Sequence, residues 1–210
     1  MHDEKRKPGR PSTELDTRNK LIGSARDLFT VLSYDKVSTR LIAKKAGVNS
    51  SMIRYYFSNK EGLFETMLRE TIEPMRLKVQ ALLLNSNRAT LFEIMRTYYQ
   101  EMLKIPHFPR LLMQVMLLPP SDVQHQLTKK VFFEVSGPMH GLVFERLHAQ
   151  GAIREDVDPR LFRMSFLSLM VFPFIMPPAT YELHDMEMNE DFLMALFEHN
   201  IKLLQHGLFN

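Results

Sequence analysis

The sequence predicts an all-α fold of about nine helices, and three observations lead to it. Apolar residues recur at helical spacing along most of the 210-residue chain, and no segment shows a competing strand pattern. Capping patterns, and an Asp158-Pro159 pair, mark helix starts. Prolines and glycines mark breaks between them. We therefore expect helices at residues 13–32, 39–45, 49–56, 59–84, 90–104, 107–118, 121–149, 159–176 and 190–207, with Gly137-Pro138 kinking or splitting the seventh.

Residues 1–12 are expected to form a flexible basic arm. The run Lys5-Arg6-Lys7-Pro8-Gly9-Arg10-Pro11 holds two prolines and a glycine, which prevent a helix. Gly9-Arg10-Pro11 resembles the core of an AT-hook, in which an extended arginine enters a narrow A·T minor groove. Arg10 is therefore a candidate DNA contact. The alternative is a disordered tail that touches phosphates without specificity.

Residues 38–63 predict two short helices about a glycine turn. Gly47 permits a left-handed turn, and Asn49 can cap the following helix. The polar residues of the second helix share one side, because residues three or four apart are neighbours; they are Ser50, Ser51, Arg54 and Tyr55. Such a helix fits the major groove of DNA, which is about 12 Å wide. The alternative is that Gly47 ends a core helix and these side chains are ordinary solvated surface.

The start of the next helix adds a candidate phosphate contact. Ser58 and Glu61 have the spacing of a capping box, which would place the positive end of that helix and Lys60 beside the same surface. Charge is also uneven along the chain. Residues 1–60 hold thirteen Lys and Arg against six Asp and Glu, a net charge of +7, whereas the remainder carries −4 of the total of +3. This asymmetry favours a polyanionic partner for the N-terminal part.

Residues 17–64 resemble the DNA-binding domain of TetR-family transcriptional regulators. The resemblance rests on Thr17-Arg18, Leu28-Phe29, Ile42-Ala43, Ala46-Gly47-Val48, Ile53, Tyr56-Phe57 and Lys60-Glu61-Gly62-Leu63-Phe64. It implies a three-helix head with a helix-turn-helix, an all-helical body that binds a ligand, and dimerisation through the last helices. We accordingly expect a DNA-binding domain at 13–60 and a ligand-binding and dimerisation domain at 61–210.

The departures from the family pattern fall on the DNA side. Asn49, Ser51 and Arg54 stand where the family usually has Ser or Thr, Gly, and Tyr, and Ser33 replaces a usual Gly. Arg54 offers a guanidinium that can bond phosphate or guanine in a fork. The complete set of candidate DNA contacts is Arg10, Ser38, Thr39, Arg40, Asn49, Ser50, Ser51, Arg54, Tyr55, Tyr56 and Lys60.

The body has the composition of an adaptable apolar interior. Thirteen of the fifteen methionines lie between residues 61 and 210, together with many phenylalanines. Each of these residues alone is more typical of simple core packing than of a ligand site. Together, the candidate lining of an apolar pocket is Met95, Met102, Met113, Met116, Phe132, Phe133, Met139, Phe166 and Met170. The resemblance and this composition predict a largely hydrophobic effector.

The last long helices suggest a homodimer. Leu161 to Met176 is apolar nearly all round, and the final helix carries an apolar stripe. The candidate interface residues are Phe162, Phe166, Leu193, Leu196, Phe197 and Leu204, although an internal core is a competing role for the first of these helices. Two-fold symmetry would require a palindromic operator.

Other functional classes find little support. The eight histidines show no metal-ligand spacing, no phosphate loop or nucleophile elbow occurs, and cysteine is absent, so we expect no metal, no cofactor and no enzyme. The most apolar stretch, residues 164–178, is too short for the roughly 20 residues of a membrane span. The charged start does not resemble a signal peptide, which predicts a cytoplasmic protein.

The resulting hypothesis is a repressor that a hydrophobic small molecule releases from double-stranded operator DNA. The alternative is a DNA-bound interaction protein, controlled by a partner protein or by none, whose apolar body is only core and interface.

Overall fold

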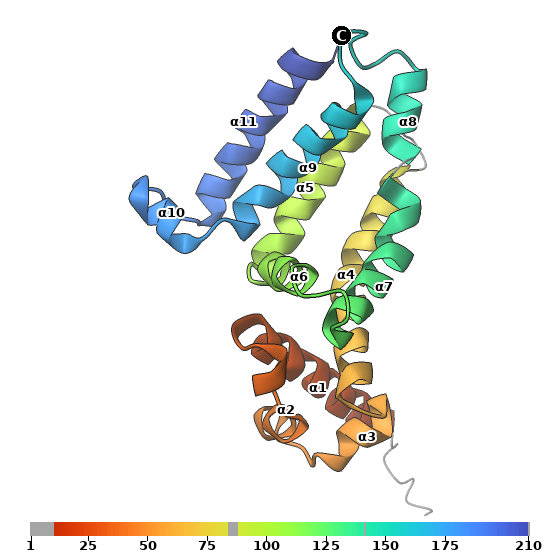
Figure 1. Ribbon diagram of the computed structural model, residues 1–210, viewed down its shortest axis with the longest axis vertical. Coiled ribbons are helices and arrows are strands. Elements are labelled where there is room, and N and C mark those ends of the chain that lie inside the picture. Colours follow the sequence, from red (N-terminus) through yellow and green to blue (C-terminus); the bar gives the residue numbers. More distant parts are fainter. Residues whose placement is uncertain (1–10, 84–87, 141, 210) are drawn as a thin grey trace, which may run out of the picture. The chain divides into compact units, whose positions relative to one another are not determined.

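The computed structural model describes residues 11–83, 88–140 and 142–209, without the side chains at 11–14, 83, 88, 136–140, 142 and 143. These residues are mostly helical and contain no strand beyond a single bridge between Ile153 and Phe209. In chain order (Figure 1), the elements are α1 Pro11–Val31, the 3-10 turn η1 Tyr34–Lys36, α2 Thr39–Ala46, α3 Ser51–Phe57, α4 Lys60–Leu83, α5 Arg88–Lys104, α6 Phe108–Met116, α7 Val123–His140, α8 Leu142–Ala149, α9 Pro159–Ile175, α10 Pro178–Leu183 and α11 Glu190–Leu208.

The all-α fold is as predicted, but the described residues form eleven α-helices where about nine were expected. The helix predicted at 121–149 is two helices, α7 and α8, on either side of residue 141. No helix was expected between residues 176 and 190, yet Pro178 begins the short helix α10 there. Proline suits the first turn of a helix, because its missing N–H has no intrahelical partner there.

The chain divides into two compact units, residues 1–68 and 69–210, which we call the head and the body. The division falls inside α4, so the first turns of this helix belong to the head and the rest to the body. Residue 10 and those before it, including Arg10 and most of the predicted arm, lie outside the described residues.

In the head, α1 packs against both α2 and α3. The centre of this core is fully buried at Leu21, Ile42 and Leu63. Three aromatic rings close it on one side: the Phe29 centroid lies 5.4 Å from that of Tyr34 and 5.0 Å from that of Phe64. This packing fixes α3 by its apolar face and leaves its other face to solvent.

In the body, α5, α9 and α11 pack against one another (Figure 1). Pro173 lies inside α9 and cannot donate to the carbonyl of Leu169, four residues earlier. That carbonyl instead accepts from the Tyr99 hydroxyl at 2.9 Å and from Asn200 Nδ2 at 3.3 Å. Tyr99 and Asn200 are buried, on α5 and α11. We call Tyr99, Leu169 and Asn200 the polar junction. Its hydrogen bonds connect α5, α9 and α11 at the carbonyl of α9 that Pro173 leaves without a backbone donor.

No helix in the described part of the chain has the length and apolar character that a membrane crossing requires.

Candidate functional site

The turn between α2 and α3 has the conformation that its residues favour. The Ser38 hydroxyl caps α2 by accepting from the N–H of Leu41 at 3.1 Å. Gly47 ends α2 in the left-handed region, with φ 67° and ψ 30°. Asn49 Oδ1 accepts from the N–H of Ser51 at 2.9 Å and so caps α3 as predicted.

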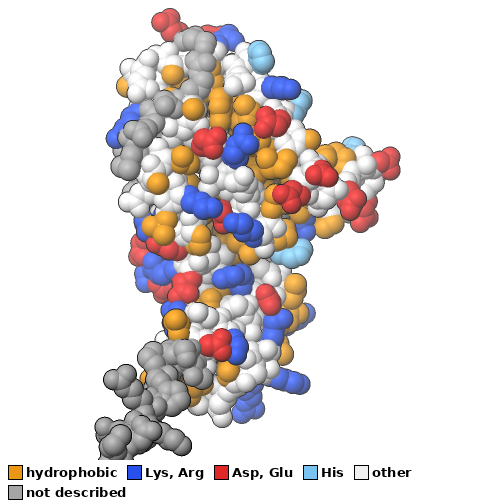
Figure 2. Space-filling model, turned by 180° about the vertical axis from the view of Figure 1, so that it is seen from behind, with side chains coloured by type: hydrophobic (Ala, Val, Ile, Leu, Met, Phe, Trp, Pro, Cys, Tyr) orange, Lys and Arg blue, Asp and Glu red, His pale blue; other side chains and the backbone are white. Residues whose placement is uncertain are grey.

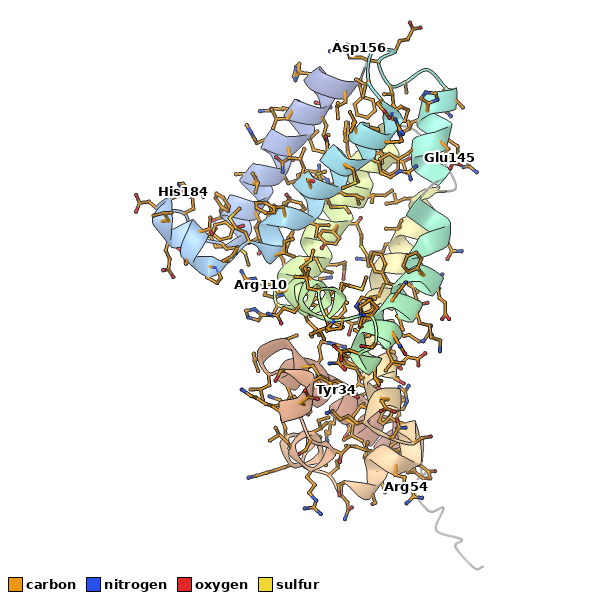
Figure 3. All side chains as sticks on the ribbon, viewed as in Figure 1. Tyr34, Arg54, Arg110, Glu145, Asp156 and His184 are labelled. Atoms are coloured by element: carbon orange, nitrogen blue, oxygen red, sulfur yellow. The ribbon has the colours of Figure 1, made fainter. Side chains whose placement is uncertain are left out.

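Helix α3 presents one apolar and one polar face. Ile53 and Phe57 are buried in the head. On the other side the structure places four exposed side chains: Ser50, Ser51, Arg54 and Tyr55. Figure 3 shows Arg54 at the surface of the head, and no described residue forms an ion pair or hydrogen bond with its guanidinium. This group is free to meet an external anion or base edge.

The remaining predicted DNA contacts on α2 and α3 differ in exposure. Arg40 is exposed, whereas Thr39 and Tyr56 are half-buried. The Tyr55 ring is 69% exposed and its edge meets Tyr56, with centroids 4.8 Å apart. In Figure 2, Lys and Arg side chains project from the head at the bottom of the view. The surface formed by α2 and α3 therefore offers cations, hydroxyls and an aromatic ring without a cluster of carboxylates.

The junction of α3 and α4 corrects the predicted capping box. Ser58 does not cap α4; its φ is positive, at 69° with ψ −47°, and the N–H of Asn59 donates to the carbonyl of Phe57 at 2.8 Å. That is a tight three-residue turn. The cap is Asn59, whose Oδ1 accepts from the N–H of Gly62 at 2.8 Å. Neighbouring Ser and Asn can both cap a helix, and the turn decides which of them reaches it.

Ser58→Gly should stabilise the head by about 1 kcal/mol, because a positive φ is strained for serine and open to glycine. Thermal unfolding of the two proteins, with operator binding as a check on the surface, measures this. A lower midpoint for the glycine variant would show that the turn carries no strain.

Lys60 is held within the head. Its ammonium donates to the carbonyl of Tyr34 at 2.6 Å and lies 3.7 Å from the centre of the Tyr34 ring. Desolvation lowers the pKa of Lys60, opposed by the charges of Asp35 and Glu61. Burial, followed by the same two carboxylates, raises the pKa of Tyr34 to about 12. Lys60 therefore has a structural role within the head. A DNA phosphate could contact its ammonium only alongside Tyr34.

The body contains a cavity of about 420 Å³ among α4, α5, α6, α7, α8 and α9. Six of the nine predicted pocket residues line it: Met102, Met113, Met116, Phe132, Phe166 and Met170. Met95 does not line it and is fully buried, Phe133 does not line it and is 60% exposed, and the side chain of Met139 lies outside the described part.

Sequence reasoning missed the contribution of α4 to this cavity. Ile72, Met75, Arg76 and Val79 line it, at the spacing of one helix face. That periodicity is visible in the sequence, although it does not distinguish a cavity wall from a packed core. Among the described residues of the lining, nitrogen or oxygen side-chain atoms come only from Arg76, Tyr98 and Thr128.

Comparison with known proteins bears on the head first. The model of the family described as bacterial regulatory proteins, tetR family, matches residues 21–67, which include α2, α3 and the turn between them. The Bacillus subtilis (strain 168) protein YttP, a probable HTH-type transcriptional regulator, is 25% identical over 93% of this chain and 95% of its own. Residues 21–67 therefore carry a DNA-binding domain of the TetR type. The chain is a DNA-binding transcriptional regulator with this domain in its head.

Solved structures share the fold of this protein along most of its length. FadR of Bacillus subtilis, in complex with stearoyl-CoA, has a TM-score of 0.68 at 19% identity over 90% of this chain and 98% of its own. The fatty acid degradation regulator FadR of Bacillus halodurans has a TM-score of 0.69 at 18% identity, with the same coverage. The ketosteroid regulator KstR2 of Mycobacterium tuberculosis has a TM-score of 0.68 at 12% identity over 98% of this chain and 97% of its own.

The structure changes which side chains are available for a dimer interface. Of the predicted interface residues, Phe162, Phe166, Leu193, Phe197 and Leu204 are buried in the chain's own core, and Leu196 is half-buried. They are buried because α5, α9 and α11 cover one another. The apolar side chains that α9 exposes are Leu161, Met164 and Phe172, and α11 exposes Leu203. We call these four residues the exposed stripe.

Among the described residues, no three His, Asp or Glu side chains are grouped as metal ligands would be.

Proposed function

We propose that this TetR-family regulator is a homodimeric repressor that binds a palindromic operator through α3 and is released when an apolar small molecule occupies the body cavity. The observation that carries the proposal is the course of α4. This helix begins in the head at Lys60, and its later residues Ile72, Met75 and Val79 form a wall of the cavity. A ligand that displaces this wall acts on the helix that leads into the DNA-binding unit.

The chemistry of the head supports the DNA part of the proposal. Ser50 and Ser51 are small and let α3 approach the groove, while Arg54 and Tyr55 are exposed and long enough to bond base edges or phosphates. Asn49 is occupied as a cap, so its contribution is to hold α3 in place. Arg40 and Ser38 lie at the start of α2, where backbone N–H groups favour a phosphate.

Arg54→Ala should weaken binding to the preferred operator by about 5- to 150-fold, the effect of about 1 to 3 kcal/mol, if the guanidinium reads a base. Fluorescence anisotropy with the operator and with a scrambled duplex measures both affinities. Lys20→Ala, which removes an exposed cation paired to Asp16 on α1, is the matched control. Equal losses on the two duplexes would assign Arg54 to phosphate.

The cavity supports the effector part. Its lining is almost entirely apolar, and apolar walls with few polar groups are typical of small-molecule sites. FadR and KstR2 carry names that refer to fatty acids and ketosteroids, which are apolar molecules. A ligand changes operator affinity only by the difference in its affinity for the bound and released conformations. We therefore expect the ligand to bind the released conformation more tightly.

The exposed stripe supports the dimer. Leu161, Met164 and Phe172 are 66%, 61% and 53% exposed and follow one face of α9, and Leu203 on the adjoining α11 is 51% exposed. Large apolar side chains exposed on one helix face are a candidate interaction site. A second copy of the chain, related by a two-fold axis, would cover them with the same residues.

Selection of bound genomic DNA fragments with purified protein tests the function. The proposal requires one enriched sequence with two inverted half-sites whose centres lie about one helical turn apart or a multiple of it. An enriched sequence without inverted half-sites would contradict binding by a two-fold symmetric dimer. DNA binding without any enriched sequence would contradict a specific operator.

A further inference from the structure

Thr128 carries a buried polar atom that the fold leaves without a partner. The residue is 1% exposed, lines the cavity, and has no hydrogen bond at Oγ1 among the described residues. A threonine inside a helix can bond back to the carbonyl four residues earlier, and this one does not. Buried hydroxyls are nearly always hydrogen-bonded, so the wall of the cavity presents an unused donor and acceptor.

The one charged group of the lining is already neutralised. Arg76 forms a fork with Glu73, with Nε 2.7 Å from Oε2 and Nη2 2.5 Å from Oε1. Its remaining Nη1 donates to Gln80 at 2.9 Å. An anionic ligand would have to take Arg76 away from Glu73 and leave that carboxylate unpaired. Among the residues that the structure describes, the cavity lining therefore offers no free cation for a carboxylate.

The third polar group of the lining is neutral as well. Burial raises the pKa of the Tyr98 phenol well above its ordinary value, and no described residue hydrogen-bonds to its hydroxyl. His125, one turn before Thr128 on α7, is also buried with an unpartnered Nδ1, but it does not line the cavity. A carboxylate brought into this lining would lose its hydration without a compensating charge.

We infer that the cavity takes an uncharged apolar ligand with a single hydrogen-bonding oxygen, and that the Thr128 hydroxyl is the group that recognises this oxygen. At roughly 30 Å³ for each non-hydrogen atom, as in liquid water, a volume of about 420 Å³ holds about fourteen such atoms. A medium-length chain that ends in an alcohol or an ester fits this description. The inference rests on the proposed function for its biological meaning, but it concerns binding to the cavity alone.

Isothermal titration of the full-length protein tests it without DNA, with dodecanol, methyl decanoate, dodecane and dodecanoate as probes. Dodecanol and methyl decanoate should each bind about tenfold more tightly than dodecane, the value of one hydrogen bond, and more tightly than dodecanoate at pH 8. Thr128→Val should remove the advantage of the two oxygen-containing probes and leave dodecane unchanged. Thr128→Ser keeps a hydroxyl and should keep the advantage.

Three results would overturn the inference: equal affinities for dodecanol and dodecane, tighter binding of dodecanoate, or a loss in Thr128→Val that is the same for dodecane as for dodecanol. Equal affinities for dodecanol and dodecane are also expected if a water molecule already hydrogen-bonds to the Thr128 hydroxyl. A separate arm measures operator binding with the same protein. Absence of operator binding would contradict the proposed function. The inference about Thr128 would then still stand or fall on the order of the ligand affinities, because those are measured without DNA.

Discussion

Asn200→Asp should lower the free energy of unfolding of the body by about 3 kcal/mol at pH 7, although it changes one buried NH₂ to an oxygen. Asn200 Nδ2 lies 3.3 Å from the carbonyl of Leu169 and 3.2 Å from the hydroxyl of Tyr99, and the side chain is 3% exposed. A carboxylate there faces an acceptor where the amide supplies a donor. If the Tyr99 hydroxyl donates to the carboxylate instead, the Leu169 carbonyl loses its hydrogen-bond donor.

The loss should depend on pH in a defined direction. Burial and the facing carbonyl raise the pKa of the new carboxyl in the folded state above the unfolded value of about 3.9. Below that value both states are protonated and the carboxylic acid can donate to Leu169 as the amide does. As the pH rises, the unfolded state loses its proton first, so the variant becomes less stable relative to the wild type between about pH 4 and pH 7.

Urea unfolding followed by circular dichroism at both pH values measures the difference. Asn189→Asp is the matched control, because Asn189 is an exposed cap of α11 whose Oδ1 accepts from the N–H of Phe192 at 2.9 Å. Aspartate caps a helix equally well and its charge suits the N-terminus, so stability should be unchanged or slightly higher. Similar losses in the two variants would show that the polar junction contributes nothing particular.

Met164→Glu should convert the proposed dimer to a monomer and lower operator affinity by at least about a hundredfold. Met164 lies in the middle of the exposed stripe on α9, so a two-fold interface would bring two new carboxylates into an apolar contact. A monomer reads one half-site and loses the gain from joining two binding events. Light scattering after size-exclusion chromatography gives the mass, and anisotropy gives the affinity.

Leu117→Glu is the control for this substitution. Leu117 follows α6, is 77% exposed, and lies outside the exposed stripe. Its variant should keep the mass and the operator affinity of the wild type. A dimeric Met164→Glu protein with normal affinity would place the interface elsewhere or show that the regulator does not dimerise.

The head was largely predictable from sequence because its signals are local. Gly47 and Asn49 each act within a few residues, and helical spacing assigned Ile53 to the core and Arg54 to the surface. The exceptions depend on neighbours. Ser58 rather than Asn59 was expected to cap α4, and Lys60 was expected to face outward, whereas it bonds to Tyr34, 26 positions earlier in the chain. A contact between residues this far apart in the chain cannot be recognised from the spacing of residues along the sequence.

The body was predictable in kind and less so in detail. Apolar spacing identifies helices with large side chains, but it does not say whether an apolar face meets the chain's own core, a cavity or a second subunit. Phe162 and Phe197 were therefore candidates for a dimer interface, with an internal core as the competing role for the helix of Phe162, and α5, α9 and α11 bury both. Phe172 was not among the interface candidates, although it is exposed. The roles of Thr128 and Asn200 depend on which carbonyls and cavities tertiary packing brings to them.

The most direct test of the central claim is the affinity of the full-length protein for its selected operator, titrated with dodecanol and with an apolar extract of cells. We predict that occupation of the cavity lowers operator affinity at least tenfold, and that Thr128→Val requires a higher dodecanol concentration for the same release. Unchanged operator affinity at ligand concentrations that saturate the cavity would contradict the account. It would favour the alternative in which a partner protein, or none, controls this regulator.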